Sequence, residues 1–252
     1  MHRSRTHGTG RIVSILRTPD NADELDITVD VQNARPNQTY GTRVYVANDL
    51  GHDVSVIDTS TNTVTATVGV GSRPAAVAVD PSGTRAYVAN FHSDNVSVID
   101  TSTNRVMATV GVGSCPYSVA VHPSSTRVYV VNGCSGDVSV IETSTNTVMA
   151  TVGLGDLRTA AWRSTLRARG YYVASGYNGI VSVIDTSANT VTATVQVGTI
   201  PFGVAVDPSG ARVYVTNWAS DDVSVIDTST NTVTATVAVG SHPTAFGHFL
   251  GP

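Results

Sequence analysis

The feature that most constrains this chain is a unit of about 42 residues that recurs five times. Each copy contains Tyr-Val-x-Asn or a close variant, followed by a run similar to Val-Ser-Val-Ile-Asp-Thr-Ser. The first motif begins at Tyr45, Tyr87, Tyr129, Tyr172 and Tyr214, so successive copies are spaced by 42, 42, 43 and 42 residues. A fixed period of about 40 residues with several short strands in each period is typical of a β-propeller. The repeats therefore predict an all-β propeller.

Residues 72–111 illustrate how one repeat forms a blade. Four runs have the Val, Thr and Ile content of strands, without a competing helical periodicity; they span residues 74–79 (A), 85–90 (B), 95–100 (C) and 105–110 (D). Polar turns separate A from B (Asp80-Pro-Ser-Gly83) and C from D (Thr101-Ser-Thr-Asn104). Each repeat is therefore expected to form one four-stranded antiparallel blade.

The two ends of the repeat array suggest how the ring closes. The first repeat starts at Gly41 and has strands B, C and D but no A, whereas residues 243–249 resemble a strand A without a blade. The economical interpretation is a five-bladed propeller over residues 41–252, in which the C-terminal strand completes the first blade and removes exposed strand edges. Residues 1–40 form an N-terminal extension: a degenerate partial repeat, an edge strand pair or a loose tail. If they form a blade, the ring has six.

The loops divide into a uniform and a diversified set. Successive hairpins alternate ends, so the A–B and C–D turns lie on one face (the bottom) and the B–C loops and D–A connections on the other (the top). The C–D turns barely change between repeats, whereas the top-face segments differ almost completely. This contrast is typical of a scaffold with a binding site on its top face, and equally of duplicated repeats that have drifted in tolerant loops.

The top-face loops hold a conspicuous set of aromatic and polar residues. We select as candidate ligand-binding residues Phe91, His92, Tyr117, Arg158, Tyr177, Phe202 and Trp218. The aromatic side chains would provide contact area, and Arg158 and His92 would provide polarity. The alternative is that the aromatic residues plug the channel mouth or pack on a neighbouring blade.

Two other sets of residues suggest chemistry at first sight. The acidic residues at 58, 100, 142, 185 and 227 recur one per blade at polar turns, where a side-chain oxygen caps backbone amides, so we assign them a structural role. His52, His92 and His242 fall on the top face, where converging imidazoles would bind a metal or act as a base. No spacing supports such a site, so we predict solvated loop histidines, no metal site and no cofactor.

Repeat four and the two cysteines depart from the pattern. Trp162 and Arg163 replace the Val and Ala of an inner strand, and Arg163 either holds an anionic ligand near the channel or belongs to a decayed repeat that faces solvent. Cys115 opens strand A of repeat three and Cys134 follows strand B. Since these strands are antiparallel, we expect the two thiols to come within reach of a disulfide bond. A reducing cytoplasm would keep them reduced.

The repeated Tyr-Val-Ala-Asn and Tyr-Val-Thr-Asn217, together with Val-Ser-Val-Ile-Asp-Thr-Ser and Thr-Val-Thr-Ala-Thr-Val, resemble the YVTN-type β-propeller repeats of bacterial and archaeal surface-layer and related proteins. The resemblance covers nearly all of residues 41–252, including the ending Pro-Thr-Ala-Phe-Gly-His-Phe. It implies a propeller fold. Members of that family typically have more blades and an export signal, and they share no catalytic motif, so no residue here inherits a role.

Composition narrows the range of partners. A formal net charge of −4 and a pI near 5.9 give no basic footprint for nucleic acid. The N-terminus lacks the apolar core of a secretory signal, and no run reaches the ~18 apolar residues of a membrane helix. We therefore expect a cytoplasmic protein with no membrane span, or an exported one if the true start is missing.

The sequence as a whole favours a non-catalytic binding or interaction scaffold. Its partner would be a small ligand, a glycan or a protein held by the top-face loops. The alternative is a propeller enzyme of the lyase, hydrolase or isomerase class with its site at the mouth of the channel. Against the enzyme stands the lack of an acid–base pair or nucleophile at a diagnostic spacing.

Overall fold

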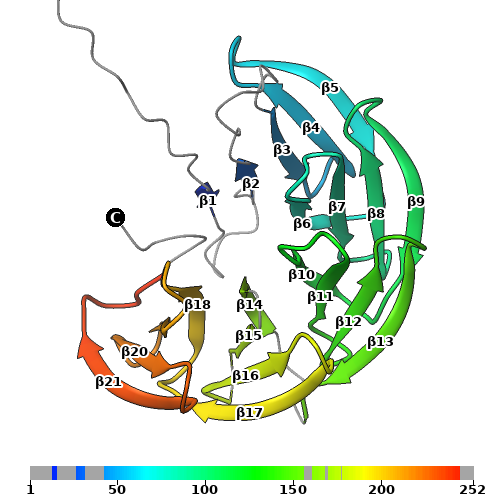
Figure 1. Ribbon diagram of the computed structural model, residues 1–252. Helices are drawn as coiled ribbons and strands as arrows, with labels where there is room; N and C mark the ends of the chain where they lie inside the picture. The colour runs from blue at the N-terminus through cyan, green and yellow to red at the C-terminus, as the bar shows by residue number, and fades with distance from the viewer. Residues whose placement is uncertain are drawn as a thin grey trace, which may run out of the picture.

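The computed structural model describes residues 13–15, 27–31, 43–155, 161–167, 170–176 and 178–244. These residues form five antiparallel sheets, and in each sheet neighbouring strands are consecutive in the chain. Figure 1 shows the sheets as blades that follow one another in an arc around a common axis, with the first and last blades at its two ends. The all-β propeller is confirmed: four of the sheets have the expected four strands, and the first has five.

The strands of the five blades have these bounds. Blade 1 contains β1 (Val13–Ile15), β2 (Ile27–Val31), β3 (Arg43–Asn48), β4 (Asp53–Asp58) and β5 (Thr63–Gly69). Blade 2 contains β6 (Pro74–Val79), β7 (Arg85–Asn90), β8 (Asn95–Asp100) and β9 (Arg105–Gly111). Blade 3 contains β10 (Pro116–Val121), β11 (Arg127–Asn132), β12 (Asp137–Glu142) and β13 (Thr147–Gly153). Blade 4 contains β14 (Ala161–Arg167), β15 (Gly170–Ser175), β16 (Ile180–Asp185) and β17 (Thr190–Gln196), and blade 5 contains β18 (Pro201–Val206), β19 (Arg212–Asn217), β20 (Asp222–Asp227) and β21 (Thr232–Ala238).

The hydrophobic core lies between blades rather than within one layer. Both faces of the middle strands are covered. Val96 and Val98 of β8 lie on one face and Ile99 on the other, and all three are fully buried. Blade 2 packs its residues Tyr87, Val96 and Val98 on Val128, Val130 and Ile141 of blade 3. Burial on both faces explains why these strands contain nearly continuous Val and Ile instead of an apolar–polar alternation.

The bottom turns are held by their acidic residues, as predicted. In blade 2, Asp100 Oδ1 accepts hydrogen bonds from the amides of Ser102 (2.9 Å) and Thr103 (2.9 Å) and from the Ser102 hydroxyl (2.6 Å). Because these bonds favour the carboxylate, led by the one from the Ser102 side chain, they lower the pKa of Asp100. The same pattern lowers the pKa of Asp58 and Asp227.

The closure of blade 1 differs from the expectation. The position of strand A, beside β3, is occupied by β2, with Val29 opposite Val46 and Val31 opposite Val44. This register matches that of Val77 opposite Val88 and Val79 opposite Ala86 in blade 2. The N-terminal strands therefore join the sheet of blade 1 instead of forming a sixth blade, and the proposed completion by residues 243–249 is corrected. Residues 245–252 lie outside the described residues.

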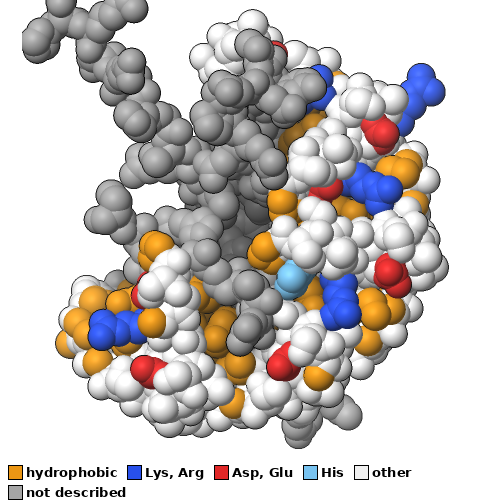
Figure 2. Space-filling model, in the orientation of Figure 1, with side chains coloured by type: hydrophobic (Ala, Val, Ile, Leu, Met, Phe, Trp, Pro, Cys, Tyr) orange, Lys and Arg blue, Asp and Glu red, His pale blue; other side chains and the backbone are white. Residues whose placement is uncertain are grey.

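The described residues include no helix that is long and apolar enough to cross a membrane. On the face shown in Figure 2, acidic and arginine side chains are scattered among hydrophobic ones.

Candidate functional site

On the top face, the B–C loop and the D–A connection of one blade are held side by side. In blade 2 the amide of Phe91 donates to the carbonyl of Arg73 (2.8 Å), and in blade 3 the amide of Gly133 donates to the carbonyl of Cys115 (2.9 Å). The expected grouping of these two segments at one end of the blade is confirmed for blades 2 and 3. Each such blade thus presents one composite edge built from two variable segments.

Part of the variation in these loops serves the fold. The D–A connections hold non-glycine residues at left-handed φ angles of 52° (Arg73), 56° (Cys115) and 53° (His242), a conformation uncommon outside glycine. A side chain from the B–C loop of the preceding blade accepts a hydrogen bond from each of these amides. The pairs are Arg73 with His52 Nδ1 (3.1 Å), Cys115 with Asp94 Oδ1 (2.8 Å) and His242 with Asp221 Oδ1 (2.7 Å). His52, expected to be a solvated loop residue, is therefore a structural link between blades.

Five side chains that do not themselves make these links come together across blades 1 to 3. Asp49 accepts two hydrogen bonds from the Arg73 guanidinium, from Nε at 2.8 Å and Nη2 at 2.9 Å. The guanidinium carbon lies 5.8 Å from the ring centroid of Phe91, within range of a cation–π interaction. The Phe91 ring in turn meets Tyr117 in a T-shaped contact at 6.2 Å and His92 at 5.3 Å. We call Asp49, Arg73, Phe91, His92 and Tyr117 the aromatic–arginine cluster.

The chemistry of this cluster favours recognition over catalysis. Phe91 and Tyr117 are half-buried, and His92 is exposed, so apolar contact area and a polar group lie together at the surface. The Asp49 carboxylate forms a bidentate pair with Arg73, so both of its oxygens accept a hydrogen bond from the guanidinium. In the part of the chain that the structure describes, no group of three His, Cys, Asp or Glu side chains is placed to hold a metal ion.

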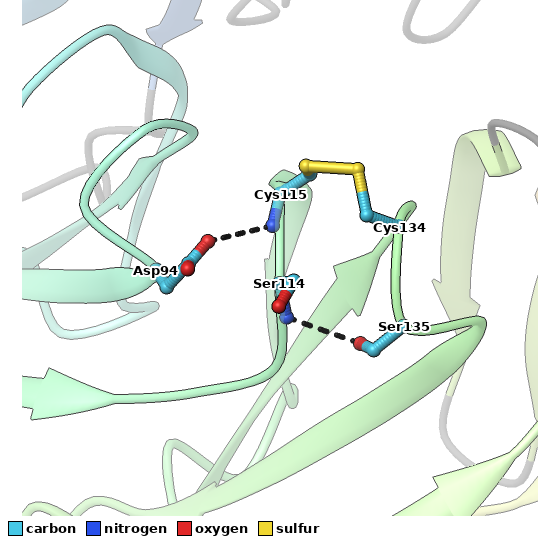
Figure 3. Close-up of a disulfide and its surroundings, with 5 residues drawn as sticks. All are labelled: Asp94, Ser114, Cys115, Cys134 and Ser135. Carbon is cyan, nitrogen blue, oxygen red and sulfur yellow. Dashed lines mark hydrogen bonds between the residues drawn. A yellow bond between two sulfur atoms is a disulfide. The ribbon is translucent and has the colours of Figure 1, made fainter.

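A disulfide bond lies next to this cluster in blade 3. Cys115 and Cys134 are bonded, with Cα atoms 5.3 Å apart, as the antiparallel arrangement of strands A and B predicted. Figure 3 shows the bond between the D–A connection and the B–C loop, beside the Asp94 and Ser135 contacts to the backbone of residues 115 and 114. The bond fixes the start of the strand that carries Tyr117.

The structure places the selected residues in three different situations. It brings Phe91, His92 and Tyr117 together in the cluster. Trp218 is half-buried on blade 5, where its ring centroid lies 4.3 Å from that of His242 with the two rings tilted by 41°. Phe202 is buried and therefore offers little contact surface in this structure. Arg158 and Tyr177 lie outside the described residues.

The sequence did not single out Asp49 or Arg73. Their pairing depends on the contact between consecutive blades, which no local pattern reveals.

The register of blade 4 also corrects the placement of Trp162. The strand pairing shifts register between Ala161 and Arg163, so Trp162 lies at a β-bulge. Tyr117 and Phe202 lie at the equivalent bulges of blades 3 and 5, and Trp162 is therefore not equivalent to an inner-strand valine. The bulge position therefore carries an aromatic residue in blades 3, 4 and 5.

Comparisons with known proteins add little beyond the fold. No protein-family profile and no curated protein matches this chain. Among solved structures, the chain is similar to one from Kuenenia stuttgartiensis hydrazine synthase, with 20% sequence identity and a TM-score of 0.46 over 84% of this chain and 92% of that one.

Proposed function

We propose that this protein is a non-catalytic binding scaffold of the YVTN-type repeat class, and that the aromatic–arginine cluster is the centre of its binding surface. The bound partner is a small ligand, a glycan or a protein segment. The observation that carries the proposal is the joining of Asp49, Arg73, Phe91 and Tyr117 across three blades. None of these four residues occupies a position whose side chain caps the backbone of the next blade.

The geometry of the cluster suits a partner with both polar and apolar groups. Arg73 is oriented by its two hydrogen bonds to Asp49, so its guanidinium is held in place before a ligand arrives. Phe91 and Tyr117 are fixed at right angles to each other, with an interplanar angle of 81°, and lose little freedom on binding. Pre-organised arginine and aromatic side chains are the residues that most often dominate binding energy.

The test is an unbiased screen followed by matched variants. The protein is screened against a glycan array and a small-molecule library by thermal shift, and each hit is measured again with Arg73→Ala and Phe91→Ala. We expect both variants to weaken binding about 10-fold or more, as loss of a central contact residue does. The control is Thr145→Ala in the bottom turn of blade 3, an exposed residue that hydrogen-bonds only locally to Thr147. Equal loss in the control, or none in either top-face variant, would place the site elsewhere.

The disulfide bond supports a proposal about the compartment. Such bonds persist in oxidising environments and are rare in a reducing cytoplasm. We therefore propose that the scaffold works outside the reducing cytoplasm, in place of the cytoplasmic location expected from the sequence. Alkylation of native cells before lysis, followed by mass spectrometry of the peptides that contain Cys115 and Cys134, tests this. Alkylated thiols would refute it, and a linked peptide pair would support it.

A further inference from the structure

His52 makes a contact between blades that other repeats make with a different kind of side chain. In each case the last residue of the B–C loop accepts a hydrogen bond from the amide of the D–A connection that follows. This residue is His52 in blade 1, Asp94 in blade 2 and Asp221 in blade 5, and its φ is left-handed in all three, at 56°, 49° and 55°. Figure 3 shows the aspartate form of the link, from Asp94 to the amide of Cys115 (2.8 Å). In blade 1 the acceptor is instead an imidazole, 3.1 Å from the amide of Arg73.

The two kinds of acceptor depend differently on pH. A histidine Nδ1 accepts a hydrogen bond only while it carries no proton, and histidine changes charge between about pH 5 and 8. An aspartate carboxylate ordinarily stays ionised over this whole range, and its oxygens remain acceptors. Because the amide of Arg73 donates to Nδ1 of His52, the contact requires the neutral imidazole with its proton on Nε2. Mild acidification therefore removes the acceptor of this link and leaves the aspartate links in place.

The donor of this link belongs to the arginine of the aromatic–arginine cluster. The amide of Arg73 donates to His52, and its carbonyl accepts from the amide of Phe91 (2.8 Å). The Arg73 guanidinium forms its bidentate pair with Asp49 beside the Phe91 ring. Asp49 and His52 lie in one loop, which the amide of His52 closes onto the carbonyl of Asn48 (3.0 Å). The hydrogen bond from Arg73 to His52 thus ties the backbone of the arginine to the loop that orients its side chain.

The charges around this link add to the effect of a proton on His52. The charged and titratable groups on the segments that meet here are Asp49 and Asp53 of the same loop, Arg73 of the D–A connection, and His92 and Asp94 of the next B–C loop. Asp53 accepts from the Asn48 carboxamide (2.6 Å), and Asp49 accepts from the guanidinium. A proton on His52 places a positive charge three residues from Asp49 in the chain, and this charge opposes the attraction between Asp49 and Arg73.

We propose that His52 is a positioning residue that makes the aromatic–arginine cluster sensitive to pH. The neutral imidazole holds Arg73 in the cluster, and protonation at mildly acidic pH releases it. A partner bound at the cluster is consequently held at neutral pH and released on acidification. The pH-dependent link depends only on the hydrogen bond to His52, whereas the release of a partner rests on the proposed function.

The test measures hydrogen exchange by NMR in the full chain without ligand, at about pH 7.5 and about pH 5.5. Each rate is divided by the intrinsic exchange rate at that pH. We expect the protection of the Arg73 amide to fall about threefold to tenfold at the lower pH, the effect of losing one hydrogen bond. The Nε–H of Arg73, which donates to Asp49, should lose protection with it. The amides of Cys115 and His242, which aspartates accept, are internal references and should keep their protection.

Matched variants separate His52 from the other titratable groups. His52→Asp gives blade 1 the acceptor of the other repeats and should make the protection of the Arg73 amide independent of pH. His52→Asn should do the same with an uncharged acceptor, and both residues tolerate a left-handed φ. Asp94→His should transfer the pH dependence to the amide of Cys115. His92→Gln removes the other histidine of the cluster and should leave the pH dependence at Arg73 unchanged.

Two results would overturn the pH-dependent link. One is protection of the Arg73 amide that changes no more between the two pH values than that of Cys115. The other is a pH dependence that persists in His52→Asp and His52→Asn, or that disappears in His92→Gln.

These measurements need no ligand, so their outcome is independent of the proposed function. A ligand found by the screen should bind the wild type at least about threefold more weakly at the lower pH and bind His52→Asp equally at both. If the link to Arg73 opens and the affinity does not follow, the pH-dependent link stands, and the release of a partner and the binding role of the cluster are refuted.

Discussion

The exposure of Val237 in blade 5 leads to a prediction about two chemically identical substitutions. Val195 in β17 and Val237 in β21 occupy the same position in consecutive repeats, but 5% of Val195 is exposed against 49% of Val237. Each is changed to alanine in a separate variant. Because the sequence context is nearly the same, the intrinsic strand preference cancels between the two variants. The difference between them therefore measures the packing of the next blade.

The expected sizes follow from the burial of each side chain. Removing two carbon atoms from a fully buried valine loses roughly 1.6 kcal/mol of transfer free energy, at about 0.8 kcal/mol per carbon. The cavity left behind raises the total for Val195→Ala to roughly 2–3 kcal/mol. At Val237 about half of that transfer term applies and water fills the space, so we expect a loss of about 0.8 kcal/mol or less. For a protein of this size, about 2 kcal/mol corresponds to roughly 4–8 °C in melting temperature.

The assay is urea unfolding monitored by circular dichroism, with thermal melts as a second probe. Val152→Ala, at the equivalent position of blade 3, serves as a second buried reference. It should match Val195→Ala within about 0.5 kcal/mol, the scatter expected for independent sites. If Val237→Ala destabilises the protein as much as the two buried variants, this valine is covered in solution and the reasoning from burial is refuted.

Three further predictions test other parts of the structure. Replacing both Cys115 and Cys134 with serine opens a loop of sequence separation 19 and should lower the free energy of unfolding by about 3 kcal/mol, measured in denaturant against the wild type with and without reductant. An equal effect of reductant on the double variant would assign the loss to something other than the bond. Gly198→Ala places a Cβ 2.3 Å from Ser220 Oγ and 2.7 Å from Asn217 Cβ, so it should destabilise by roughly 1–3 kcal/mol, whereas Gly111→Ala, with nothing within 4 Å, should be nearly silent in the same thermal melts. Asp58, Asp100 and Asp227 have lowered pKa values in the folded state, so their contribution to stability is complete above about pH 4 and is lost as the pH falls through the lower folded values. In Asp100→Asn the melting temperature should therefore fall less steeply as the pH is lowered. An unchanged fall would show that the turn carboxylates do not drive acid unfolding.

Much of the fold follows from the sequence because the interactions that define it are local. The Asp-Thr-Ser-Thr-Asn turns are closed by hydrogen bonds between residues two and three positions apart, and a short segment therefore specifies them. Each hairpin joins strands that are adjacent in the chain, so four strands per repeat and the two sets of loops could be predicted. The Cys115–Cys134 bond could be predicted for the same reason, since it joins the two ends of one hairpin.

The candidate site was only partly predictable from the sequence. Phe91, His92 and Tyr117 stood out as aromatic or polar residues in variable loops, and the structure brings them together. Phe202 had the same signal but is buried, a difference that its sequence context does not reveal because burial depends on other segments of the chain. Asp49 and Arg73 gave no signal, since their ion pair joins two different repeats.

The sequence by itself determined the blade: its four strands, its turns and the apolar content of both faces are all set by interactions within about 40 residues. Only the tertiary structure decided what lies between blades and at the ends of the arc. There, near-identical repeats are placed in unequal surroundings, so the same valine is buried in four blades and exposed in the fifth. The strand that completes blade 1 was decided in the same way. The sequence assigned that position to residues 243–249, whereas in the structure residues 27–31 pair with β3.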